Sequence, residues 1–259
     1  MSAMSGTVAV NTFREAVRDR VLYNLVFFAL LMIGAAILVG QISIGIDRLV
    51  IVNLGLSAIS AFGLVMAIFI GVGLIYKEME KRTLYSLLAK PVRRWEFIVG
   101  KYAGLLLTLF VNTCLMTLGV AVALFYVSRE FSRSDVYILV AIYFILLKLA
   151  LVTALALFFS CFSTPMLSTL FTLGIYLAGM FSTDFLNIGM VTKSPAVKAI
   201  TRILYYVLPN FHNFDVIGRA AHGFAIPLAL IGQNTLYTLL YSALLLIAAA
   251  AVFSGRNLK

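Results

Sequence analysis

Six long apolar runs, joined by more polar connections, dominate this chain and restrict what it can fold into. They cover residues 21–41, 49–76, 103–127, 136–162, 166–181 and 235–253. A hydrocarbon core about 30 Å thick is crossed by about 20 helical residues. Because lipid cannot satisfy free backbone groups, each run is expected to be a helix. The sequence therefore predicts an all-α polytopic membrane protein with about six transmembrane helices.

The overall composition agrees with a lipid environment. The chain has 259 residues, of which 63% are hydrophobic and 12% are charged, whereas soluble domains are about half apolar and about a quarter charged. The apolar runs leave no room for an additional soluble domain, so we expect residues 1–259 to form a single transmembrane domain. The net charge is +10, but the basic residues lie between apolar runs and not on a polar face interleaved with aromatic residues. Nucleic-acid binding is therefore not expected.

The placement of lysine and arginine predicts the orientation. Three such residues precede the first run, seven lie between the second and third runs, and two follow the last run, which makes twelve on one side against seven on the other. Positive residues concentrate on the cytoplasmic side of membrane proteins. Both termini and the connection 77–102 are therefore predicted to be cytoplasmic.

The segment 8–20 is predicted to form a short amphipathic helix before the first span. Thr12 and Glu15 have capping-box spacing, which predicts a helix starting at Thr12. Phe13 and Val17 share one helix face, and Arg14 lies on another. Such a helix is expected to lie in the plane of the lipid headgroups; the alternative is a plain extension of the first span.

The connection 77–102 is the most informative part of the chain. Leu84, Leu87 and Leu88 recur at helical spacing, and Pro91 ends the helix that they predict. The result is a short amphipathic helix held under the membrane by two long spans. Its apolar stripe is expected either to press against the headgroups or to dock in a groove of another protein.

The segment 182–234 is predicted to lie on the outer side. Its apolar runs 203–208 and 224–231 are too short to cross a bilayer. They predict helices that re-enter the membrane partway or lie on its outer surface before the last span.

One charged residue, Lys148, lies near the middle of the fourth run. A charge at that depth costs about 2.5–3.5 kcal/mol on insertion scales. The lysine is therefore a candidate for contact with a polar cavity or an anionic lipid headgroup. The alternatives are snorkelling and a packing contact with a neighbouring helix.

No catalytic, cofactor-binding or metal-binding residues are predicted. His212 and Asp215 have a spacing that can share a helix face, and His222 follows, but polar outer segments often contain such residues. Cys114 and Cys161 lie inside apolar runs, where cysteine commonly acts as a small hydrophobic residue. No Ser/His/Asp set or carboxylate pair falls at a shared depth, which disfavours an intramembrane enzyme. The phosphate-binding pattern G-x-x-x-x-G-K-[ST] does not occur in the sequence.

The cytoplasmic connection resembles that of ABC-2-type transporter permeases, and so does the layout of nearly the full chain. The residues that carry the resemblance are Glu80, Thr83, Leu84, Leu87, Leu88, Pro91, Val92, Arg94, Gly100 and Lys101. Arg93 departs from the pattern, because a small polar residue is expected there as a cap for the next helix.

The resemblance implies the permease subunit of an ATP-driven exporter in the cytoplasmic (inner) membrane of a prokaryote. Two permease subunits, either identical or similar, would pair, and each would dock a separate ATPase subunit that binds ATP and magnesium. The coupling contact would be formed by Glu80, Thr83, Leu84, Leu87, Leu88, Pro91 and Arg94. The alternative is a membrane-embedded structural or assembly subunit without transport activity.

Overall fold

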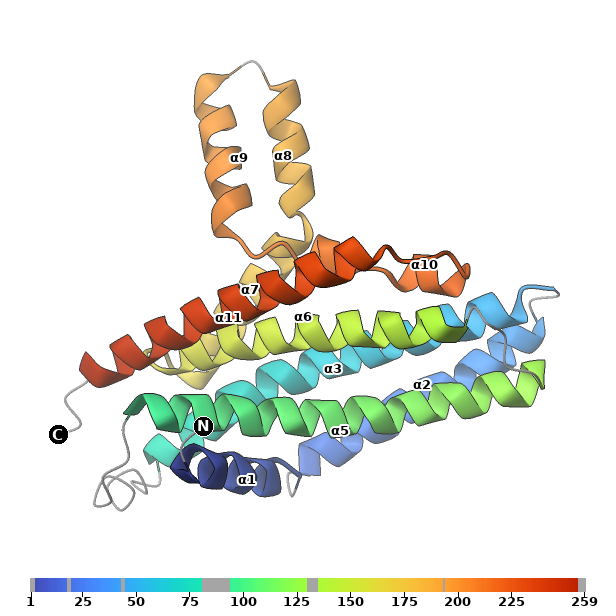
Figure 1. Ribbon diagram of the computed structural model, residues 1–259, viewed down its shortest axis with the longest axis horizontal. Helices are drawn as coiled ribbons and strands as arrows, with labels where there is room; N and C mark the ends of the chain where they lie inside the picture. Colours follow the sequence, from blue (N-terminus) through green and yellow to red (C-terminus); the bar gives the residue numbers. More distant parts are fainter. Residues whose placement is uncertain are drawn as a thin grey trace.

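The computed structural model describes residues 3–17, 20–42, 45–80, 94–129, 135–192 and 194–255, and its regular structure is entirely helical. Long helices run side by side in one bundle (Figure 1): α2 (Arg20–Ile42), α3 (Asp47–Glu80), α5 (Arg94–Ser128), α6 (Val136–Ser160) and α11 (Leu228–Gly255). These five are long and apolar enough to cross a membrane. A sixth crossing is formed if α7 (Pro165–Met180) and α8 (Ser182–Val191), which meet at a bend of 51°, are one broken span. The predicted all-α membrane protein with about six spans is confirmed.

The two ends of the bundle differ in what they carry. We call the end with α1 (Ala3–Val17), the last turn of α3 and the first turn of α5 the terminal end, because the first described helix of the chain and the end of α11, the last one, lie there (Figure 1). The opposite, far end carries the α2–α3 turn and α10 (Ile217–Ala221). α3 has 34 residues and α5 has 35. At 1.5 Å per residue each is about 50 Å long, so both reach beyond a hydrocarbon core of about 30 Å.

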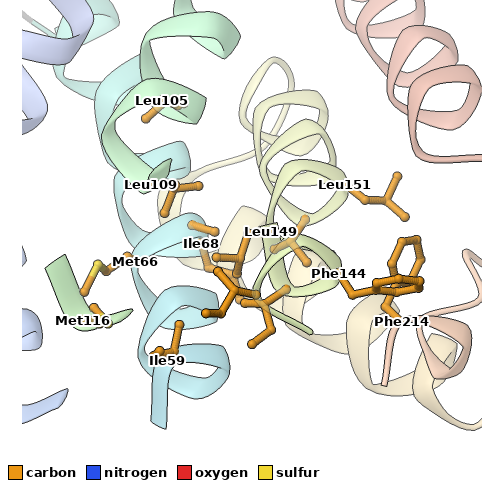
Figure 2. Packing of buried hydrophobic residues seen from close by; sticks show 14 of the residues in the cluster. Ile59, Met66, Ile68, Leu105, Leu109, Met116, Phe144, Leu149, Leu151 and Phe214 are labelled. Atoms are coloured by element: carbon orange, nitrogen blue, oxygen red, sulfur yellow. The ribbon is translucent and has the colours of Figure 1, made fainter. Parts of the chain in front are cut away.

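Helix α6 forms the centre of the bundle. It packs against α3, α5, α7 and α11, and it is hydrophobic on all sides, as expected for a helix surrounded by protein. Leu149 and Leu151 of α6 are fully buried. Figure 2 shows Leu149 on the side of α6 that faces Ile59 and Ile68 of α3, near Leu109 of α5, and Leu151 on the other side of α6, toward Phe214. The core thus joins α3 and α5 through α6.

Small residues allow the long helices to approach one another closely. A Cβ atom added at Gly63 of α3 would lie 2.7 Å from Leu149 Cδ1 of α6. One added at Gly71 would lie 3.0 Å from the Ala156 Cβ atom. α3 and α6 are thus in direct contact at both glycines, through the Leu149 side chain and the Ala156 methyl group.

The segment between α7 and α11 folds into short helices. α8 and α9 (Pro195–Val207) form a hairpin that projects sideways from the bundle (Figure 1). η2 (His212–Phe214) and α10 then return the chain to the bundle. The Phe211 amide donates to the Gly179 carbonyl at 3.1 Å, and the Asn210 amide donates to Tyr237 Oη at 3.0 Å. The predicted re-entrant or surface position of this segment stays a prediction.

Two predicted helix starts are wrong. α1 begins at Ala3, not at Thr12, which lies inside the helix and is 1% exposed. α11 begins at Leu228, not at residue 235, so the apolar run 224–231 is not a separate helix. The polar residues before 235 continue α11 because Asn234 Nδ2 donates to the Leu230 carbonyl of the preceding turn at 2.9 Å.

Candidate functional site

The predicted coupling contact begins and ends at the terminal end of the bundle. Glu80 is the last residue of α3 and Arg94 is the first residue of α5; their side chains lie outside the described part of the structure. The other predicted contact residues, Thr83, Leu84, Leu87, Leu88 and Pro91, fall within residues 81–93 and also lie outside it. The coupling contact itself therefore stays a prediction, and the structure describes the helices on either side of it.

Helix α1 packs directly on the start of α5. A Cβ atom added at Gly100 would lie 2.8 Å from the Val8 Cβ atom and 2.9 Å from the Ser5 carbonyl oxygen. One added at Gly104, one turn later, would lie 2.5 Å from the Ala9 carbonyl oxygen and 2.6 Å from the Thr12 Cβ atom. Glycines four residues apart let two helix backbones touch. α1 is therefore fixed to the part of α5 that directly follows the connection 81–93.

A buried lysine links three helices next to this contact. The Lys101 side chain on α5 is 2% exposed, and its Nζ atom lies 3.8 Å from Glu15 Oε2 of α1. The same Nζ atom lies 5.7 Å from the centre of the Phe97 ring, a cation–π geometry. Phe97 stacks on Phe253 near the end of α11, with ring centres 6.0 Å apart. The terminal end thus holds α1, α5 and α11 together by charge and aromatic contacts.

Lys148, the predicted cavity or lipid contact, lies between α6 and α3 and is 9% exposed. Its ammonium donates a hydrogen bond to Ser60 Oγ of α3. The Gly63–Leu149 contact lies one residue later on α6 and three residues later on α3, so the polar bond is close to a tight packing contact between the same two helices. A hydroxyl partner lowers the cost of burying the ammonium. Contact of Lys148 with a cavity or lipid stays a prediction.

The polar residues at the far end have structural partners. Arg48, at the start of α3, forms an ion pair with Asp135, which directly precedes α6. Asp215 Oδ1 accepts a hydrogen bond from the Ile217 amide at 3.4 Å, and the His222 ring stacks on Phe224. Within the described ranges no group of three or more His, Cys, Asp or Glu side chains is placed to hold a metal ion.

Several of these contacts were not predicted from the sequence. The spacing of Gly100 and Gly104 is a recognisable signal for close helix packing, but nothing local identifies α1 as the partner. Glu15 and Ser60, the partners of the two buried lysines, are separated from them by 86 and 88 positions. Only the packing of the helices brings them together.

Comparison with known proteins assigns the chain to a family of transport proteins. The sequence model of the ABC-2 family transporter proteins matches residues 7–258. The chain therefore belongs to the ABC-2 transporter family and is, in general terms, a permease of an ABC transporter. A comparison with curated proteins gives no significant match.

Proposed function

We propose that this protein is the permease subunit of an ATP-driven exporter. Two copies, or one copy and a similar chain, form the translocation path across the cytoplasmic membrane of a prokaryote. A separate ATPase subunit binds ATP and magnesium and docks at the terminal end, which faces the cytoplasm together with both chain termini.

The observation that carries this proposal is the arrangement of α3 and α5. Both helices are longer than a bilayer core requires, and both reach the terminal end. Their connection, residues 81–93, contains the leucine stripe of the predicted coupling helix. A force applied to this connection would act on both long helices. Because α3 is packed along the central helix α6, the force would also reach α6.

The contact between α1 and α5 supports the same proposal. Gly100 and Gly104 hold α1 close to the first turns of α5, and Lys101 adds the Glu15 contact. A movement of the coupling segment would thus be transmitted to α1 and α5 as one unit. We propose that α1 lies at the cytoplasmic membrane surface and stiffens the start of α5.

Affinity purification tests the proposal against its alternative. The tagged full-length chain, extracted in detergent from its native membrane, is expected to retain a companion polypeptide with ATP-binding motifs. The purified complex is expected to hydrolyse ATP in a vanadate-sensitive manner and to contain two permease chains. A stable complex without an ATP-binding subunit would instead favour the structural or assembly subunit.

The Lys148→Met variant is expected to assemble normally but to hydrolyse ATP more slowly when transport substrate is present. Methionine keeps the length of the side chain and removes the charge that bonds to Ser60 of α3. We expect about a tenfold loss of substrate-stimulated activity or more, because a hydrogen bond to a charged group contributes about 1.5 kcal/mol or more and each 1.4 kcal/mol corresponds to about a factor of ten. The measurement is ATP hydrolysis by the purified complex with and without substrate.

Ser60→Ala is the matched variant for Lys148→Met. It removes the hydroxyl partner and keeps the ammonium, so both variants lose activity if the link between α3 and α6 is what matters. If only Lys148→Met loses activity, the lysine acts by its charge toward a cavity or a lipid. Unchanged activity in Lys148→Met would leave the lysine with a packing role alone.

A further inference from the structure

A groove of about 760 Å³ lies at the far end of the bundle, where α2, α3 and α5 meet. Gln41 contributes from the end of α2 and Asp47 from the start of α3. Val122, Phe125 and Tyr126 contribute from the last turns of α5, and Arg129 follows that helix. A volume of this size lies within the range of about 300–1,000 Å³ that small-molecule sites commonly have.

The groove carries one charge of each sign. Asp47 is partly buried, Arg129 is exposed, and within the described ranges neither forms a salt bridge. The neighbouring arginine, Arg48, is committed to Asp135. Arg129 has a left-handed backbone with φ of 53°, and its amide donates to the Phe125 carbonyl at 3.0 Å. This bond fixes Arg129 directly beside the aromatic residues of the groove.

The α5 side of the groove is apolar and open. Val122 is 68% exposed and Tyr126 is 66% exposed. Toward the middle of α5 the same surface continues with Leu118 and Leu115, which are also exposed. An exposed apolar stripe thus leads from the groove along α5 toward the middle of the helix, away from the two charges.

We propose that this groove binds a zwitterionic phospholipid from the leaflet at the far end. Its ammonium group would face Asp47, its phosphate would face Arg129, and an acyl chain would lie along Val122 and Leu118. An ordinary water-soluble ion would satisfy only one of the charges and would leave the exposed aromatic rings without an apolar partner. A phospholipid with an ammonium and a phosphate satisfies both charges and covers the apolar wall.

Native mass spectrometry of the purified complex tests the proposal with three lipids of identical dioleoyl chains. These are phosphatidylethanolamine, which carries both charges, phosphatidylglycerol, which carries only the phosphate, and diacylglycerol, which carries neither. The native protein is expected to retain phosphatidylethanolamine at least about fivefold better than diacylglycerol, as expected from one or two charge-assisted hydrogen bonds. Phosphatidylglycerol should be intermediate. Equal retention of all three lipids would overturn the proposal.

Two variants separate the two charges. Asp47→Asn is expected to lower retention of phosphatidylethanolamine to the level of phosphatidylglycerol. Arg129→Gln is expected to lower retention of both phospholipids and to leave retention of diacylglycerol unchanged. Arg129→Lys keeps the positive charge and should retain both phospholipids better than Arg129→Gln does. Asp184→Asn and Arg202→Gln, on the α8–α9 hairpin, are matched controls that should bind as the native protein does.

The variants are expected to keep the fold. Size-exclusion chromatography checks this, because a folded variant should elute as a single complex. Asparagine can replace aspartate at the start of a helix with little loss. If Asp47→Asn and Arg129→Gln both retain phosphatidylethanolamine as the native chain does, the groove is not the lipid site. If soluble glycerophosphoethanolamine displaces the lipid at equal concentration, the site recognises the headgroup alone and the proposed acyl-chain contact is wrong.

Discussion

The Gly104→Val variant is expected to separate α1 from α5 and to lower the thermal stability of the protein strongly. Even the first added atom would lie 2.5 Å from the Ala9 carbonyl oxygen and 2.6 Å from the Thr12 Cβ atom. The first obstacle is backbone, which cannot move aside as a flexible side chain can. Overpacking commonly costs about 1–3 kcal/mol, and we expect about 3 kcal/mol or more here because the whole helix must shift. The measurement is the melting temperature of the detergent-solubilised protein, followed by size-exclusion chromatography after heating.

The chain offers a matched control for this substitution. Gly34 lies inside α2, and a Cβ atom there would meet nothing within 4 Å. Gly34→Val therefore adds the same side chain to a long helix without a clash. Gly104→Ala should fall between the native protein and Gly104→Val. If Gly104→Val melts at the same temperature as Gly34→Val, α1 does not pack on α5 as the structure shows.

The long helices could be predicted from the sequence because the bilayer sets a physical length. A span needs about 20 apolar residues, and no polar backbone group can remain free within it. Predicted spans 21–41 and 136–162 accordingly agree with α2 and α6 within two residues at each end. The start of α11 was missed because residues 232–234 interrupt the apolar run. Asn234 is nonetheless buried and bonds to its own helix, so its polarity does not end the span.

Contacts between helices could not be predicted, since they depend on which faces meet. Lys148 was recognisable because a charge at mid-span is costly. Ser60 was not recognisable, because one serine in an apolar helix has no local sign of a partner. At Ser60 a contact was missed, whereas at Thr12 a local pattern led to a wrong prediction. The spacing of Thr12 to Glu15 predicted a helix start, yet the Thr12 side chain is buried against the Gly104 region of α5.

Replacing both Leu84 and Leu87 by aspartate is expected to release the ATPase subunit while the permease remains folded in the membrane. If these leucines dock in an apolar groove of the ATPase, each substitution removes an apolar contact and places a charge there. Burying an unpaired polar group and truncating a contact residue each cost about 2 kcal/mol. Two such changes together weaken docking by about a thousandfold or more. The measurement is the amount of ATPase that remains with the tagged permease during affinity purification.

Ser86→Asp distinguishes a docking contact from a general effect of charge. Residue 86 falls on the opposite face of the predicted helix from Leu84 and Leu87, so an aspartate there adds one negative charge to the segment but places it away from the apolar stripe. The complex should survive in Ser86→Asp and dissociate in the double variant. If the double variant retains the ATPase, the leucine stripe contacts lipid headgroups instead, and the force from ATP hydrolysis must enter through another surface of the terminal end. α1 would then be the next surface to test, because it is fixed to α5 at Gly100 and Gly104 independently of the connection 81–93.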